Sequence, residues 1–242
     1  DVEAKTYTGK KLKELLHNVN TKDQHIIRSL QNPVTPAPTI TILSGNLAPK
    51  GAVIKVAAAS PQLLQHSGKA VVFENYEEML ARIDDEALEA DESSVLVLKH
   101  AGPKAVPGMP EWGMIPIPKK LRAKGVSDMV RISDARMSGT AFGTVILHVT
   151  PEAAAGGPLA LVRTGDTISI DIPAGKIALD ISVEEMTARM KKFTPPTTPH
   201  TRGYPALSIR EVLQADEGCD LAFLKPNGPE ELHFIEPVVG RS

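Results

Sequence analysis

The run S-D-A-R-M-S-G-T-A-F-G, from Ser133 to Gly143, tells more about this chain than any other stretch of it. A strand-like segment, Met129–Ile132, leads into the run, and an apolar β-type segment, Thr144–Val149, follows it. Its glycines permit backbone angles that other residues resist. Two interpretations follow from the spacing alone. One is a plain hairpin turn in which Ser138 bonds its own backbone. The other is a bent turn that aims a hydroxyl, beside Arg136, at a substrate.

Length and composition indicate a globular chain with an aliphatic core. Of 242 residues, 42% are hydrophobic but only 4% are aromatic, so Val, Ile, Leu, Ala and Met must fill the core. The net charge of −2, without a basic cluster, argues against a nucleic-acid surface. No apolar run approaches ~18 residues, so no membrane span is predicted. The N-terminus lacks a signal-peptide pattern, and we expect a cytoplasmic protein.

Periodicity predicts a β-rich chain with a few helices. Strands are predicted at residues 39–43, 52–57, 69–73, 94–99, 129–132, 144–149, 167–172 and 176–181. Helices are predicted at residues 11–17, 23–30, 75–90, 118–124, 182–192 and 207–214, with short helical turns at 60–66 and 151–155. Prolines recur through residues 100–118, which we therefore expect to form a long irregular loop with a function.

Five motifs, taken in order, resemble one family. They are G-N-L-A-P-K-G-A-V-I-K (45–55), A-G-P-K-A-V-P-G-M-P-E-W-G (101–113), R-M-S-G-T (136–140), H-V-T-P-E-A-A-A-G-G-P-L-A (148–160) and E-G-C-D (217–220). Through most of residues 37–223 the chain resembles the C-terminal domain of the dihydroxy-acid dehydratase and phosphogluconate dehydratase family. The A-R-M-S-G-T turn is similar to the sugar-acid branch, such as arabinonate or xylonate dehydratases. The branched-chain amino-acid enzymes usually carry G-R-F-S-G-G there.

The resemblance implies a fold and a division of the chain. It implies a mixed α/β, β-rich domain, a swivelling β/β/α barrel with flanking helices. Residues 1–36 are then the tail of a separate N-terminal domain with its linker, and residues 37–194 are the barrel-like domain. Residues 195–242 are a proline-rich linker and an extension that packs on the domain or on a partner. Because the chain starts at Asp1 without a methionine, we expect it to be part of something longer.

The chemistry of dehydration points to particular side chains. Removing water from a 2,3-dihydroxy acid needs a base at C2 and a Lewis acid at C3. The resemblance implies that Ser138 is the base, as an alkoxide, in place of a plain turn hydroxyl. Thr140 is either a substrate-contacting hydroxyl or a strand residue bonded locally. An extended turn would place both hydroxyls on one side. Arg136 either orients a substrate carboxylate or bonds loop carbonyls, and the latter is favoured.

The resemblance also implies two cofactors. Glu111, on the P-G-M-P-E loop, would be one ligand of a Mg²⁺ ion, with the alternative that it is an exposed loop carboxylate. Many relatives have glycines where this chain has Lys104-Ala105-Val106, and a stiffer loop would move Glu111. An iron–sulfur cluster would be bound by the separate N-terminal domain, because Cys219 is the chain's one cysteine. Cys219 itself is expected to serve packing, and His148 is expected to be a satisfied core histidine.

The sequence therefore predicts the C-terminal domain of an iron–sulfur, Mg²⁺-dependent hydro-lyase. It would convert an aldonic acid to its 2-keto-3-deoxy product, be inactive as this chain alone, and assemble as a homo-oligomer at full length. Two alternatives remain open: a branched-chain dihydroxy-acid dehydratase domain, and a stand-alone binding domain without catalysis.

Overall fold

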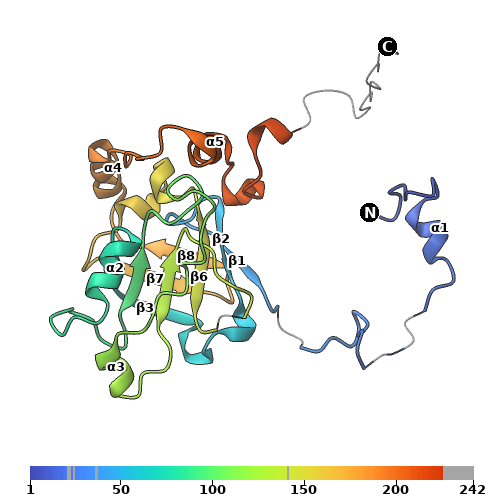
Figure 1. The fold of residues 1–242 in the computed structure, drawn as a ribbon. Coiled ribbons are helices and arrows are strands. Elements are labelled where there is room, and N and C mark those ends of the chain that lie inside the picture. Colours follow the sequence, from blue (N-terminus) through green and yellow to red (C-terminus); the bar gives the residue numbers. More distant parts are fainter. Residues whose placement is uncertain (21–22, 24, 36–37, 141, 226–242) are drawn as a thin grey trace, which may run out of the picture. The chain divides into compact units, whose positions relative to one another are not determined.

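The computed structural model describes residues 1–20, 23, 25–35, 38–140 and 142–225 (Figure 1). The chain divides into two compact units, Asp1–Pro38 and Thr39–Ser242. The predicted boundary between residues 194 and 195 stays a prediction, and the end of the predicted C-terminal extension, 226–242, lies outside the described residues.

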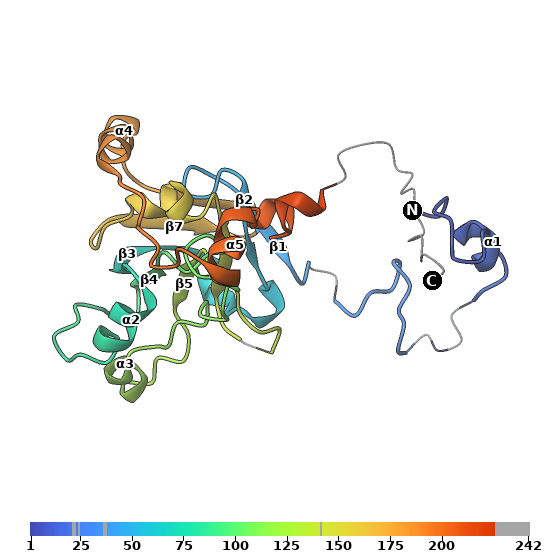
Figure 2. The same cartoon turned by 45° about the horizontal axis from the view of Figure 1, so that its top comes forward.

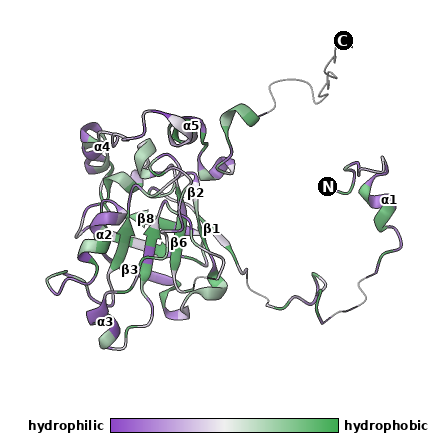
Figure 3. Ribbon diagram, in the orientation of Figure 1, coloured by the Kyte–Doolittle hydropathy of each residue, from purple (hydrophilic) through white to green (hydrophobic). Residues whose placement is uncertain are grey.

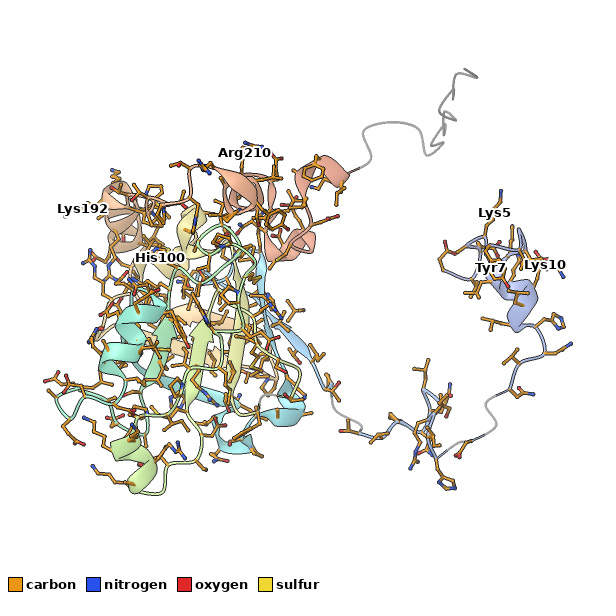
Figure 4. The ribbon with its side chains drawn as sticks, viewed as in Figure 1. Lys5, Tyr7, Lys10, His100, Lys192 and Arg210 are labelled. Atoms are coloured by element: carbon orange, nitrogen blue, oxygen red, sulfur yellow. The ribbon has the colours of Figure 1, made fainter. Side chains whose placement is uncertain are left out.

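The N-terminal unit contains one short helix, α1 (Leu12–Leu16), as predicted. Glu3 holds its first turn through ion pairs with Lys11 (2.8 Å) and Lys13 (2.6 Å). Figure 4 shows Tyr7 close to this helix, and the Tyr7 ring is fully exposed. The second predicted helix, at residues 23–30, is wrong for the described residues of that range, which form turns. One reason is that the Asp23 carboxylate accepts the N–H groups of residues 25 and 26 and closes a turn.

The second unit is built on one eight-stranded sheet. Its strands, in spatial order, are β1 (Thr41–Leu43), β2 (Gly51–Ile54), β6 (Val145–Thr150), β5 (Val130–Ser133), β4 (Val95–Leu98), β3 (Gln65–Phe73), β7 (Thr167–Asp171) and β8 (Lys176–Leu179). The four central strands pair in parallel and the outer ones pair antiparallel. A bridge from Ser44 to Lys176 joins the two edges, so the sheet is a nearly closed barrel. The predicted β-rich, barrel-like mixed α/β fold is confirmed.

All eight predicted strands form, although some of their ends differ. β3 begins at Gln65, four residues before the predicted start, because Gln65–Lys69 pairs with β7. That pairing replaces the end of the helical turn predicted at residues 60–66, where only Pro61–Leu63 forms a 3-10 turn. β2 ends at Ile54, and Val56–Ala58 is another 3-10 turn.

The core consists of two apolar clusters, one on each face of the central strands. Inside the barrel, the buried side chains are aliphatic, as the composition predicts. Outside it, Phe73 of β3 and Leu98 of β4 pack with Met79 and Leu121 under helices α2 (Tyr76–Arg82) and α3 (Lys119–Ala123). Parallel strands covered on both faces read as continuous apolar runs, which Figure 3 shows as green arrows.

The helices depart from prediction mainly at their ends. α2 ends at Arg82, not near Ala90, because the Asp85 carboxylate accepts the Ala87 N–H and turns the chain. α3 lies beside this turn, and Lys120 Nζ donates to the carbonyls of Glu86 and Leu88 (Figure 2).

The last two helices cap the barrel domain at the side away from α3 (Figures 1 and 2). α4 (Val183–Lys192) begins as predicted, with Ser182 Oγ accepting the N–H of Glu185 at 3.1 Å. α5 (Gly203–Glu211) starts four residues earlier than predicted, because Pro205 lies in its first turn, where its missing N–H costs nothing. Of the described residues, no helix has the length and apolar character that crossing a membrane requires.

Candidate functional site

The serine-bearing run forms a crossover between parallel strands. Arg131 of β5 lies opposite Val145 of β6 in a parallel register, so the hairpin interpretation is wrong. The chain leaves the end of β5 and returns beside its start within residues 134–144. We call this segment the serine loop. A connection this short between parallel strands has to be held at both ends.

The returning end of the serine loop is fixed by a buried ion pair. Asp128 and Arg131 form a 2.8 Å contact, with side chains only 5% and 2% exposed. Burial opposes ionisation of Asp128, but hydrogen bonds from Thr144 and Ser60 and the Arg131 charge together lower its pKa. Gly143 passes this pair at φ +97°, and a Cβ there would lie 2.0 Å from Arg131 Nη2. Only glycine fits this position.

The departing end is held by a second buried carboxylate, on Asp134. Its two oxygens accept the N–H groups of Ala101 and Ala153, both at 2.9 Å. Burial raises the pKa of Asp134 to about 6, against the opposing effect of those hydrogen bonds. This carboxylate joins the serine loop to the long loop that starts at residue 100.

The tip of the serine loop is open and carries the predicted hydroxyls. Ser138 Oγ lies 3.0 Å from Thr140 Oγ1, so the two hydroxyls are on the same side, although Gly139 and Thr140 form a turn and not an extended segment. The Thr140 N–H also points to Ser138 Oγ, at 3.4 Å. Lys55 Nζ donates to the Gly139 carbonyl at 2.8 Å and brings a positive charge to the tip. Around Gly139 a Cβ would meet no atom within 4 Å.

Glu111 and Arg136 meet between the two loops. Glu111 Oε1 lies 2.7 Å from Arg136 Nη1, with the side chains 47% and 43% exposed. Arg136 Nε donates to the Met109 carbonyl at 2.7 Å, and the Gly113 N–H donates to the Arg136 carbonyl at 2.8 Å. The Arg136 guanidinium thus bonds one loop carbonyl and one loop carboxylate, and a contact with a substrate carboxylate stays a prediction.

The loop that carries Glu111 is pinned on both sides of it. Trp112 stacks on Tyr76 of α2, with ring centroids 4.2 Å apart and planes 8° from parallel. Met109 has φ +44°, a conformation uncommon for a residue with a side chain. As predicted, residues 100–118 hold no helix or strand.

At residues 104–106, where many relatives have glycines, the structure shows how this chain holds the loop. Glu152, 1% exposed, accepts the N–H groups of Lys104 and Ala105, while Lys104 Nζ donates to the Ile209 carbonyl of α5. Burial raises the pKa of Glu152. The Glu152 carboxylate thus holds the loop through its backbone N–H groups, although these positions carry no glycine.

A cavity of about 370 Å³ lies against Arg136 and is lined by residues of β2, β6 and the segment 215–219. His148 lines it and is half-buried, with a pKa lowered by burial and by the Arg136 charge. It therefore borders a cavity and is not the core histidine we expected. Cys219 also lines the cavity, with Sγ 3.7 Å from Met109 Sδ and its pKa raised by burial.

His100 and Lys99 stand outside this site. His100 Nδ1 contacts the Glu74 carbonyl at 2.8 Å, and Figure 4 shows His100 on the barrel domain. Within the described part of the chain, its Nε2 has no partner. Lys99 is buried and donates to Glu74 (2.9 Å) and to the Ala160 carbonyl (3.1 Å).

The residues of this site could supply one ligand to a metal ion but not a complete set of ligands. In the described ranges, no three His, Cys, Asp or Glu side chains lie close enough to hold one together. Glu111 nevertheless keeps Oε2 without a partner among those residues, and a carboxylate oxygen suits Mg²⁺. Cys219 is a single thiol, and a cluster needs several.

Sequence reasoning missed the groups that hold the loops. Asp128, Arg131, Asp134 and Glu152 each bind a backbone group between 11 and 48 residues away along the chain. One signal was present, since Arg131 stands in an otherwise apolar strand. A buried charge of this kind is kept only where it is paired.

Fold and site together define a barrel-like domain that presents a hydroxyl pair and a carboxylate on adjoining loops. The chain belongs to the dihydroxy-acid/6-phosphogluconate dehydratase family, because the model of that family's C-terminal domain matches residues 25–219.

Three relatives illustrate the range of similarity. The chain is 54% identical over 228 residues to an L-arabonate dehydratase of Azospirillum brasilense, covering 92% of this chain and 39% of that protein. It is 48% identical over 227 residues to a 6-deoxy-6-sulfo-D-gluconate dehydratase of Pseudomonas putida (93% and 39%). It is 40% identical over 223 residues to a dihydroxy-acid dehydratase of Acetivibrio thermocellus (89% and 38%). The chain thus spans about two fifths of the length of these relatives.

Proposed function

We propose that the chain is the C-terminal domain of a sugar-acid dehydratase that converts an aldonic acid to a 2-keto-3-deoxy acid. The observation that carries the proposal is the paired hydroxyls of Ser138 and Thr140 at an open loop tip, next to the loop of Glu111. The higher identity to sugar-acid dehydratases, 48–54% against 40% for a dihydroxy-acid dehydratase, supports the substrate class.

In the proposed reaction, the C2–H bond and the C3–O bond of the substrate break and an enol forms. The C2 proton passes to Ser138 Oγ, which must be deprotonated beforehand, and hydroxide leaves C3. The enol then tautomerises to the 2-keto acid. Thr140 Oγ1, 3.0 Å away, would donate its one hydroxyl proton to the Ser138 alkoxide and hold it in place, and it could still accept a hydrogen bond from a substrate hydroxyl. Lys55 at the tip would favour the negative alkoxide electrostatically.

The remaining parts of the site would come from elsewhere. Glu111 would give one oxygen ligand to Mg²⁺, and the other ligands and an iron–sulfur cluster would belong to an N-terminal domain. When bound, these groups would supply positive charge at the substrate carboxylate and a Lewis acid at C3. Homo-oligomeric assembly and a cytoplasmic location stay predictions, and so does inactivity of this chain alone.

A substrate panel on the full-length protein tests the proposal. We expect turnover of aldonic acids such as L-arabinonate and little turnover of 2,3-dihydroxyisovalerate, with no turnover by the 242-residue chain. A preference for dihydroxyisovalerate would instead favour the branched-chain alternative. Turnover by the chain alone would contradict the division of the site between two domains.

A further inference from the structure

We infer that Arg136 is a positioning residue that ties Glu111 and the Ser138 turn into one unit. The inference rests on the proposed function, in which Glu111 is a metal ligand and Ser138 the base. It assigns Arg136 a role toward the protein's own loop in place of a contact with the substrate.

Among the described residues, the hydrogen bonds of Arg136 run to the loop of residues 109–113. Its Nε donates to the Met109 carbonyl and its Nη1 to Glu111 Oε1, both at 2.7 Å. Its carbonyl accepts the Gly113 N–H at 2.8 Å. Two of the three bonds need the planar fork of a guanidinium, which lysine lacks. Arg136 therefore spans the loop on both sides of Glu111 while lying two residues from Ser138.

The loop needs this support at its Met109 end. Met109 is held at φ +44°, and conformations of this kind persist only where their surroundings fix them. On the other side of Glu111, the Trp112–Tyr76 stack fixes the chain independently. Close packing fixes Gly113 as well, because a Cβ there would lie 2.2 Å from Leu147 Cδ2 and 2.8 Å from the Arg136 carbonyl oxygen.

The carboxylate is oriented by the same contact. Glu111 is about half exposed and would otherwise sample several rotamers, but its Oε1 is held by Arg136 while Oε2 stays free of partners within the described residues. A carboxylate fixed through one oxygen presents the other in a defined direction. Groups that orient a metal ligand in this way typically contribute about 10- to 100-fold to metal affinity.

The test compares variants of the full-length protein by Mn²⁺ binding, measured by electron paramagnetic resonance after removal of bound divalent metal. We expect Arg136→Lys to weaken Mn²⁺ affinity about 10-fold or more. Arg210→Lys is the matched control, because Arg210 is 70% exposed and its side chain forms an ion pair with the neighbouring Glu211. Glu111→Gln should remove the site altogether.

A second readout needs no metal. Hydrogen exchange of the peptide that covers residues 109–113 should be faster in Arg136→Lys than in the parent protein and unchanged in Arg210→Lys. Arg136→Gln, which keeps one donor near the Met109 carbonyl, serves if the lysine variant does not fold, and should show the same two changes.

The outcomes separate the inference from the proposed function. Loss of Mn²⁺ binding in Glu111→Gln with unchanged binding and exchange in Arg136→Lys would overturn the inference alone. So would a rise confined to the KM for the aldonic acid, which would make Arg136 a substrate contact. Unchanged Mn²⁺ binding in Glu111→Gln would overturn the metal assignment in the proposed function.

Discussion

The two ends of the serine loop differ from its tip in burial, in charge and in hydrogen bonding. At the ends the polar groups are buried and bonded: Asp128 pairs with Arg131, and the Asp134 carboxylate accepts two backbone N–H groups. At the tip, Ser138 and Thr140 bond mainly to one another. Stability therefore resides where the loop joins the barrel, whereas the groups proposed for chemistry lie where few contacts hold them. Substitutions at the ends should lower the free energy of unfolding, whereas substitutions at the tip should lower activity and leave stability nearly unchanged.

The largest loss of stability is expected from Asp128→Ala. It leaves Arg131 buried without its partner, which should lower the free energy of unfolding by about 3–5 kcal/mol. Urea unfolding of the 242-residue chain measures this. The exposed pair Asp84–Lys119 is the control: Lys119→Ala removes this ion pair but keeps the Lys119 N–H bond to Asp84, and it should cost about 0.5 kcal/mol or less. Equal losses in the two variants would show that the buried pair does not hold the loop.

Gly143→Ala should come next, with a loss of about 2–4 kcal/mol. Its Cβ would collide with Arg131 Nη2, and its φ of +97° disfavours any side chain. The matched variant at the tip, Gly139→Ala, meets no atom within 4 Å and should change the free energy of unfolding by about 0.5 kcal/mol at most. The two melting temperatures compare the regions directly. If Gly139→Ala lowered the melting temperature as much as Gly143→Ala, the proposed difference in stability between the loop tip and the loop ends would be contradicted.

The stability contributed by Asp134 should fall as pH rises from about 4 to 6, against an opposite effect of His148, whose lowered pKa makes the unfolded state bind more protons below about pH 6.5. The pKa of Asp134 is raised from 3.8 to about 6, so in this window the folded state binds more protons than the unfolded state. The free energy of unfolding then decreases with pH, by about 3 kcal/mol at most from this group. The raised pKa of Glu152 acts in the same direction, whereas the lowered pKa of Asp128 acts only below about pH 4.

Urea midpoints measured between pH 4 and 7 test this titration. Asp134→Asn removes one titrating group and should flatten the curve, although it loses one of the two bonds from Ala101 and Ala153. An unchanged slope in the variant would mean that Asp134 does not titrate in this window.

The sequence predicted the parts of the fold that depend on local pattern. The eight strands follow from apolar runs and alternation, and the α4 start follows from Ser182 capping. The end of α2 was missed because helical periodicity continues through residues 83–90, although Asp85 turns the chain there. The parallel pairing of β5 and β6 was missed because two strands close in sequence usually form a hairpin, and only long-range pairing decides otherwise.

The candidate site was predictable to a similar extent. Motifs singled out Ser138, Thr140 and Glu111, and the structure places the two hydroxyls together. The partner of Glu111 was not predictable, because Arg136 lies 25 residues away and meets it only through the arrangement of two loops. The carboxylates of Asp134 and Glu152 likewise act on backbone groups brought near by the barrel.

Ser138 at the loop tip is proposed as the base at C2, and Ser138→Ala in the full-length protein tests this claim. We predict that kcat for an aldonic acid falls by about 10²–10⁴-fold, as for loss of a general base, while the melting temperature of the protein is unchanged. A variant that dehydrates the substrate at the parent rate would contradict the claim, and the open tip would then need another role.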